Sequence, residues 1–260
     1  MAFKSRKRRN GVEFTFEGDI LMLTKASITQ SLVEVRQRID QAVARSKRDP
    51  STIRLLAVSK YQPVTSLEEA YQAGQRAFAE NRVQEWLDKV PSLPNDCEWH
   101  LVGSLQTNKV KYLDHHNLAM IHSLDRFSLL ETLNTQGELR GKTWTTLVQV
   151  NIARDSAKAG FKPEEVSDFL DSVGDYPHVR VQGFMTIGAL EADTQETQGF
   201  FRDLRDLRDC LQSRKWPGVD LRELSMGMSR DFELAIEEGA TLVRVGREIF
   251  GERGNKPGKG

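Results

Sequence analysis

Cysteine is scarce in this chain, and the two that occur, Cys97 and Cys210, stand far apart among 260 residues. Neither belongs to a CxxC pair or lies in a group of histidines, so the sequence gives no support for a disulfide framework or a zinc site. The five histidines show no HxH or HExxH spacing, and we expect no metal site. A chain without disulfides suits a reducing compartment, so the predicted location is the cytoplasm.

The chain also lacks a net charge and a long apolar run. Lys and Arg together number 37, as do Asp and Glu, which leaves no basic surplus for binding a nucleic acid or an anionic membrane. A membrane-spanning helix needs about 18 or more consecutive apolar residues. No such stretch occurs, and we expect neither nucleic acid nor membrane as a partner.

The two ends of the chain differ in composition from the part between them. The first ten residues, MAFKSRKRRN, are basic, but the acidic stretch GVEFTFEGD follows where a signal peptide would have its apolar segment. We expect residues 1–24 to form a disordered extension and residues 253–260 to form a flexible tail. Residues 25–252 then form the folded domain.

Within that domain, eight short apolar runs alternate with amphipathic segments. The runs are rich in Val, Leu and Ile with little alternation, which is typical of strands buried on both faces. They cover residues 53–59, 76–80, 98–103, 118–123, 145–151, 179–187, 221–227 and 241–246, and the predicted helices cover 26–47, 66–75, 125–134, 162–173, 196–212 and 230–239. Eight strands with helical connections predict an α/β fold, a single (β/α)8 TIM barrel, with a doubly wound open sheet as the alternative.

The strand LLAVS ends at Lys60, just before YQPV. In a barrel of this type, reactive residues gather where strands end and the following loops begin. Pro63 fixes a turn at this point, so the Lys60 amine would be held at the barrel mouth, where it can attack an aldehyde as a nucleophile. Taken alone, a lysine at a strand end more often returns to solvent.

The last two strands carry a second pattern. In SMGMSRD a glycine and Ser229 precede a helix, and in VRVGREIFG the residue Gly246 does the same. Free backbone N–H groups and a hydroxyl at such positions suit a phosphate group, although the glycines would also serve simply to make tight turns. A lysine on one side of the mouth and a phosphate cradle on the other predict a site for pyridoxal 5'-phosphate, bound to the lysine as an imine.

Several motifs in order along residues 27–252 resemble the YggS/PROSC family of pyridoxal phosphate homeostasis proteins. These are AVSK, ENRVQE, WHLVGSLQTNK, IHSLD, GFMTI, LSMGMSRDFELAIEEGATLVRVG and IFG. Two departures are Ala79, where the family usually has glycine, and the stretch ARDSAKAGF, which follows the usual pattern only loosely. Both departures leave the lysine and the phosphate cradle intact.

The resemblance implies a fold-type III barrel like the N-terminal domain of alanine racemase, without the additional β-domain of the racemases. It implies Lys60 as the residue that binds the cofactor covalently, and Ser229 with the backbone near Gly246 as the phosphate site. Arg244 would face the pyridine nitrogen. The remaining residues that the resemblance places in the cofactor pocket are Asn81, His100 and Met185.

An arginine opposite the pyridine nitrogen favours binding over catalysis. A guanidinium stays protonated, so it donates a hydrogen bond to that nitrogen but supplies no proton to it. We therefore expect a carrier that buffers or transfers pyridoxal phosphate with little or no catalysis, as a monomer or weak dimer, with PLP-dependent apo-enzymes as recipients. Two alternatives stay open: an amino-acid racemase or decarboxylase that uses this cofactor, and a Schiff-base aldolase in which Lys60 acts without a cofactor.

Overall fold

The structure is a computed structural model that describes residues 27–114, 117–188 and 192–251 in full, together with the backbone of residues 7–9, 12–17 and 20–25. The predicted C-terminal tail, residues 253–260, and the remainder of the predicted extension lie outside the described residues.

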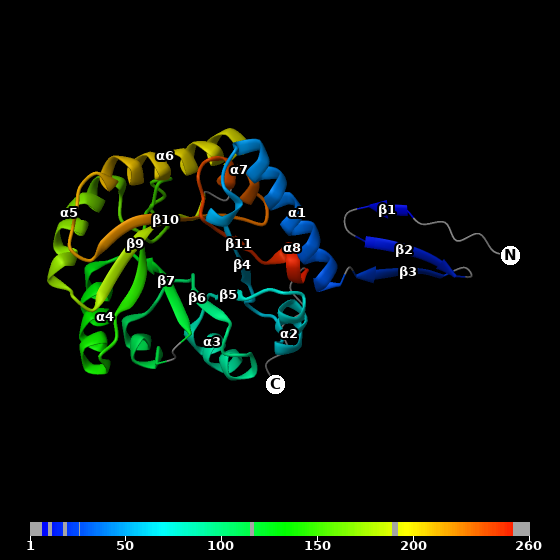
Figure 1. Cartoon of the computed structure of the whole chain (residues 1–260), viewed down its shortest axis with the longest axis horizontal. Helices are drawn as coiled ribbons and strands as arrows, with labels where there is room; N and C mark the ends of the chain where they lie inside the picture. Colours follow the sequence, from blue (N-terminus) through cyan, green and yellow to red (C-terminus); the bar gives the residue numbers. More distant parts are fainter. Residues whose placement is uncertain are drawn as a thin grey trace.

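The domain is a closed barrel of eight parallel strands, which confirms the predicted (β/α)8 fold (Figure 1). The strands are β4 (Arg54–Val58), β5 (Ala77–Glu80), β6 (Glu98–Leu101), β7 (Leu118–Leu124), β8 (Trp144–Gln149), β9 (Val179–Met185), β10 (Val219–Met228) and β11 (Leu242–Val245). Their order around the barrel is β10-β11-β4-β5-β6-β7-β8-β9, and all the pairings are parallel. Every strand therefore points its C-terminal end to the same mouth.

Helices surround the strands on the outside (Figure 1). The α-helices are α1 (Ile28–Ser46), α2 (Val64–Gln72), α3 (Val83–Lys89), α4 (Phe127–Arg140), α5 (Val166–Ser172), α6 (Thr194–Gln212), α7 (Phe232–Glu237) and α8 (Arg247–Phe250). The 3-10 turns are η1 (Pro50–Thr52), η2 (Val90–Ser92), η3 (Thr107–Tyr112), η4 (Pro163–Glu165) and η5 (Val173–Asp175).

Local sequence signals explain where the two longest helices begin. The Ser27 hydroxyl accepts the N–H of Gln30 at the start of α1. Asp193 and Glu196 form a reciprocal capping box at the start of α6. The connection between β6 and β7 is the 3-10 turn η3, so it follows the predicted helix-like pattern in a shortened form.

The buried apolar residues form two layers. The larger layer packs between the strands and the helices and contains the bulky side chains of Trp86, Trp99, Trp144 and Phe184. The smaller layer fills the inside of the barrel and consists of Leu56, Val58, Ala79, Val102, Met120, Leu147, Met185 and Leu242. The barrel interior also contains buried polar residues, among them His100, His122, Ser225 and Arg244, so part of the interior is built for hydrogen bonding.

Three short strands occupy part of the predicted N-terminal extension. They are β1 (Lys7–Arg9), β2 (Val12–Glu17) and β3 (Ile20–Lys25), and they form an antiparallel sheet in the order β1-β2-β3. This sheet lies beside the barrel and shares no strand pairing with it (Figure 1). Across the described residues, none of the helices has the length and apolar character needed to cross a membrane.

Candidate functional site

Four consecutive strands of the barrel bring five of the seven predicted site residues to its C-terminal mouth. In the order β10-β11-β4-β5, these strands are followed by Ser229, Gly246, Lys60 and Asn81, and Arg244 lies within β11. The backbones are close together, since a Cβ built on Gly246 would lie 3.0 Å from the carbonyl oxygen of Val58. Residues that are far apart in the sequence therefore share one half of the rim.

The turn that contains Lys60 is strained and firmly held. Tyr61, the next residue, has a φ angle of 64°, in the left-handed region that costs a residue with a side chain about 1–3 kcal/mol. Its N–H donates to the carboxylate of Glu85, and the carbonyl oxygen of Ser59 accepts from Lys89 Nζ at 2.7 Å. Both contacts come from α3, which therefore fixes the turn on either side of the half-buried Lys60.

A buried ion cluster supports these contacts. Lys89 Nζ lies 2.7 Å from an oxygen of Glu80 and 2.7 Å from an oxygen of Glu85, and the Ser59 hydroxyl donates to Glu80 at 2.7 Å. Burial raises the pKa of Glu80, and attraction to the Lys89 ammonium opposes that rise. Glu80 is fully buried, so its charge depends on Lys89. We call Ser59, Glu80, Glu85 and Lys89 the lysine clamp.

The two groups of the predicted phosphate cradle lie next to each other. Gly246 N–H donates to the Ser229 hydroxyl at 3.4 Å, so the two groups that were predicted to hold a phosphate are neighbours. The turn that leads to Ser229 requires a glycine, because Gly227 has a φ angle of 87° and a Cβ there would lie 2.5 Å from Ala235 Cβ. Asp231 accepts the N–H of Met228 and fixes the same turn.

Arg244 points into the barrel and is 5% exposed. Its Nη1 donates to the Ser225 hydroxyl at 2.6 Å, and its Nη2 donates to the carbonyl oxygen of Thr186 at 2.8 Å. Burial lowers the pKa of Arg244 to about 10, so the guanidinium is still charged at neutral pH. A guanidinium has five N–H donors, so these two contacts leave others for a bound molecule.

The other predicted pocket residues occupy different depths of the barrel. Met185 is fully buried in the interior apolar layer. Asn81 lies against Gly103, since a Cβ on that glycine would lie 2.2 Å from the carbonyl oxygen of Asn81. His100 is fully buried with its Nδ1 3.0 Å from His122 Nε2, and it lines a pocket of about 360 Å³ together with Arg54 and Glu98, the first residues of β4 and β6. His100 therefore faces the N-terminal mouth, and its contact with a cofactor stays a prediction.

The arrangement fits pyridoxal phosphate in its chemistry. An amine, a hydroxyl beside a backbone N–H, and a buried cation match the aldehyde, the phosphate and the ring nitrogen of that molecule. Sequence analysis missed Glu80, Lys89 and Ser225, which hold Lys60 and Arg244 in position. The only local signal was the i,i+4 spacing of Glu85 and Lys89, which many exposed helices share.

Comparison with known proteins agrees with this arrangement. The protein-family model of the alanine racemase N-terminal domain matches residues 31–254 of the sequence. The pyridoxal phosphate homeostasis protein of Aquifex aeolicus (strain VF5) is 42% identical over 225 residues, which are 86% of this chain and 97% of the relative. The protein of that name from Escherichia coli (strain K12) is 36% identical over 230 residues, 87% of this chain and 97% of the relative.

Solved structures show the same fold. PipY of Synechococcus elongatus PCC7942, solved with PLP bound, has a TM-score of 0.75 and 37% identity, with 86% of this chain and 100% of that chain covered. An alanine racemase of Clostridium difficile 630 has a TM-score of 0.66 at 14% identity, with 89% of this chain and 56% of that chain covered, which is a likeness of fold alone. The identity and the coverage of the homeostasis proteins show that this chain belongs to the family of pyridoxal phosphate homeostasis proteins.

Proposed function

We propose that this chain binds pyridoxal phosphate at the C-terminal mouth of its barrel and takes part in keeping the cofactor available in the cell. Lys60 would bind the aldehyde covalently, Ser229 and the N–H of Gly246 would hold the phosphate, and Arg244 would face the ring nitrogen. The observation that carries the proposal is the convergence of these groups from three consecutive strands, β10, β11 and β4. The PLP-bound relative PipY supports the identity of the ligand.

The residues of the site favour holding the cofactor over using it. Bound pyridoxal phosphate supplies an aldehyde that reacts reversibly with amines and a ring that withdraws electrons. Arg244 would donate a hydrogen bond to the ring nitrogen but transfer no proton to it, because a guanidinium keeps its proton at neutral pH. This weakens the ring as an electron acceptor and supports buffering and transfer over racemisation or decarboxylation. The PLP-bound relative also argues against a cofactor-free aldolase.

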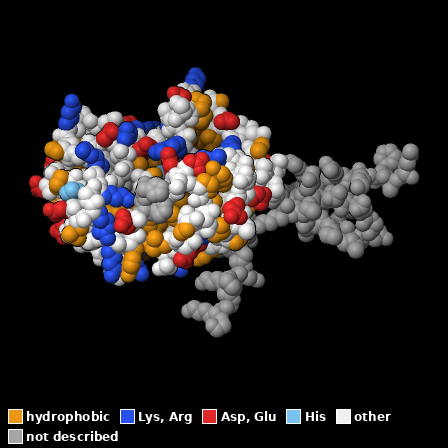
Figure 2. Space-filling view, turned by 60° about the horizontal axis from the view of Figure 1, so that its bottom comes forward, with side chains coloured by type: hydrophobic (Ala, Val, Ile, Leu, Met, Phe, Trp, Pro, Cys, Tyr) orange, Lys and Arg blue, Asp and Glu red, His pale blue; other side chains and the backbone are white. Residues whose placement is uncertain are grey.

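The wider role follows from the family. Relatives carry the name pyridoxal phosphate homeostasis protein, and we propose PLP-dependent apo-enzymes as recipients of the cofactor. We propose the cytoplasm as the location, in keeping with the two free cysteines. We further propose a monomer or weak dimer, since the residues assigned to the site all belong to a single chain. On the face shown in Figure 2, basic and acidic side chains are interspersed, which gives a nucleic acid little to bind there.

A spectrum tests the proposal. Purified protein loaded with pyridoxal phosphate should be yellow, and borohydride should remove the absorbance by reducing the bond to the lysine. Lys60→Ala should lose the absorbance, whereas Lys215→Ala, at an exposed position between α6 and β10, should keep it. Equal absorbance in the two variants would refute the role of Lys60. Rapid racemisation or decarboxylation of a common amino acid by the pure protein would refute the carrier role.

A further inference from the structure

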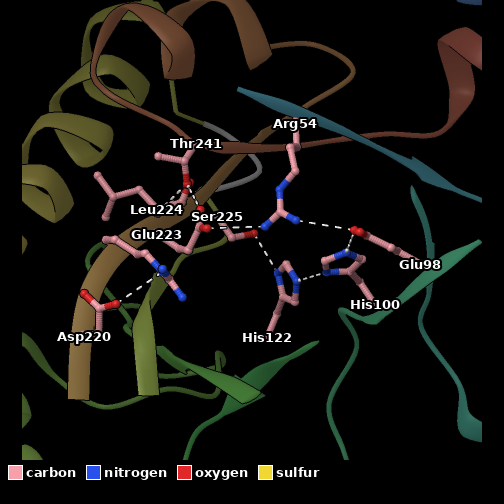
Figure 3. Close-up of polar contacts among 10 residues, drawn as sticks. Arg54, Glu98, His100, His122, Asp220, Glu223, Leu224, Ser225 and Thr241 are labelled. Atoms are coloured by element: carbon pink, nitrogen blue, oxygen red, sulfur yellow. Dashed lines mark hydrogen bonds and ion pairs between the residues drawn. The ribbon is translucent and has the colours of Figure 1, made fainter. Parts of the chain in front are cut away.

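A chain of hydrogen bonds runs through the inside of the barrel from Arg244. The Ser225 hydroxyl accepts from Arg244 Nη1 at 2.6 Å and lies 2.8 Å from His122 Nδ1. His122 Nε2 lies 3.0 Å from His100 Nδ1. Figure 3 shows His122 between Ser225 and His100. Ser225, His122 and His100 are fully buried, so solvent does not compete for these contacts.

The chemistry of arginine sets the direction of the first bond in this hydrogen-bond chain. A guanidinium only donates, so the Ser225 oxygen accepts from Arg244, and among the described contacts of Ser225 the ring nitrogen His122 Nδ1 is the acceptor available to its hydroxyl hydrogen. If the hydroxyl donates to Nδ1, the proton of His122 lies on Nε2 and is donated to His100 Nδ1, and the proton of His100 lies on its own Nε2. Burial lowers the pKa of His100 to about 3 and the pKa of His122 well below its usual value. Both rings are therefore neutral at pH 7, so each carries one proton.

The chain of hydrogen bonds ends at the opposite, N-terminal mouth of the barrel. His100 Nε2 faces the carboxylate of Glu98 at 4.0 Å, and that carboxylate is paired with Arg54 Nη1 at 3.4 Å. Arg54 Nη2 pairs with Glu223 at 3.3 Å, and Figure 3 shows Arg54 between the carboxylates of Glu98 and Glu223, alongside the two imidazoles. At 4.0 Å the contact of His100 with Glu98 is too long for a hydrogen bond, and His100 Nε2 has no hydrogen-bond partner among the residues that the structure describes. The nearby carboxylate attracts an N–H at this position through its charge.

We propose that Ser225 and His122 are positioning residues for Arg244. We also propose that His100 and the Arg54–Glu98 pair keep the hydrogen bonds of this network donating in the direction away from Arg244. The proposal rests on the proposed function, because it assigns these residues to the side of the site that faces the cofactor ring. Every proton in the chain is directed toward the N-terminal mouth. The guanidinium would thereby be held as a donor to the ring, and none of Ser225, His122 and His100 would direct a proton back toward Arg244. A protein that carries the cofactor without catalysis needs Arg244 held in place by neutral groups that do not protonate the ring.

Two substitutions at one position test the direction of the chain. Asn places its carbonyl oxygen near the position of His122 Nδ1, so His122→Asn keeps an acceptor for Ser225. His122→Gln places its amide nearer the position of Nε2, so the bond from Ser225 is lost. We expect His122→Gln and Ser225→Ala to raise the dissociation constant of pyridoxal phosphate about fivefold or more and to shift its absorbance maximum, and His122→Asn to stay within about twofold of the wild type. Equal effects of the Asn and Gln substitutions, or no effect of all three, would overturn the proposal.

Nitrogen NMR of the cofactor-free wild-type protein gives an independent test. The 15N shifts of both imidazoles should report protonated Nε2 and unprotonated Nδ1 at pH 7. A proton on His122 Nδ1 would overturn the proposal even if every variant folded poorly. The two claims fail separately: absorbance retained in Lys60→Ala would refute the cofactor site, whereas the tautomers are measured without any cofactor.

Discussion

The two sides of the candidate site are held by opposite kinds of chemistry. The Lys60 side depends on the lysine clamp, in which buried charges hold a strained turn. The Arg244 side depends on a neutral serine and two neutral imidazoles. A buried charge costs several kcal/mol unless it is paired, whereas a neutral hydrogen bond contributes about 1 kcal/mol. The structure thus places rigidity at the residue proposed to bind the cofactor covalently and hydrogen bonds between neutral groups at the residue proposed to face the ring.

Breaking the lysine clamp should have the largest effect. Lys89→Met leaves the fully buried Glu80 without its cation, and we expect the free energy of unfolding to fall by about 3–5 kcal/mol. Denaturant unfolding measures this loss. The double variant Lys89→Met with Glu80→Gln should recover part of it, because the uncompensated charge is gone. A loss below about 1 kcal/mol in the single variant would show that the cluster does not hold the turn.

On the Arg244 side, we expect the backbone conformation of Gly227 to contribute more to the free energy of unfolding than any charged group does. Gly227→Ala forces a φ angle of 87° on alanine and a Cβ contact of 2.5 Å with Ala235, so we expect a loss of about 2–3 kcal/mol and weaker cofactor retention. Gly199→Ala is a matched control, because Gly199 lies within α6 and its added Cβ meets no atom within 4 Å. That control should stabilise the protein by up to about 1 kcal/mol. Similar thermal shifts in the two variants would contradict the account.

Acid should weaken the Arg244 side. The pKa of His100 is about 3 in the folded protein against 6.5 as the ordinary value, so the unfolded chain binds more protons between these pH values. The contribution of the buried neutral histidines to the free energy of unfolding is therefore fully present above about pH 6.5 and is lost as the pH decreases toward 3. Each such histidine changes the free energy of unfolding by about 1.4 kcal/mol per pH unit. His122→Asn should remove one such contribution from the slope of unfolding free energy against pH. An unchanged slope between pH 6 and about 4.5 would show that His122 is not buried in its neutral form.

Removing the Arg54–Glu98 ion pair, at the far end of the hydrogen-bond chain, should have the smallest effect on the free energy of unfolding. Arg54 and Glu98 have side chains that are 42% and 52% exposed, and solvent screens such a pair. Glu98→Gln should cost less than about 1 kcal/mol in denaturant unfolding, and the difference should shrink at high salt. A loss as large as that of Lys89→Met would mean that the two sides are supported alike.

The fold was predictable from the sequence because buried parallel strands have a distinctive pattern. The run at residues 76–80 became β5 (Ala77–Glu80), and the run at 145–151 became β8 (Trp144–Gln149). The positions of Lys60, Ser229 and Arg244 followed from the strand ends, since a barrel gathers these ends at one mouth.

The supports of the site were not predictable in the same way. The helix α3 (Val83–Lys89) was missed, since its seven residues give too short a periodic pattern, and with it the partner of Glu80 was missed. The contact between His122 and Ser225 joins residues 103 positions apart and depends on how the strands are staggered around the barrel. No local pattern in the sequence encodes that stagger.

The central claim is that Lys60 is the residue that binds the cofactor covalently. Loading the full-length protein with pyridoxal phosphate, reducing it with borohydride and mapping the modified peptide by mass spectrometry tests this claim most directly. The account predicts the phosphopyridoxyl group on Lys60 at close to one per chain. Modification confined to other lysines, with Lys60 unmodified, would contradict it.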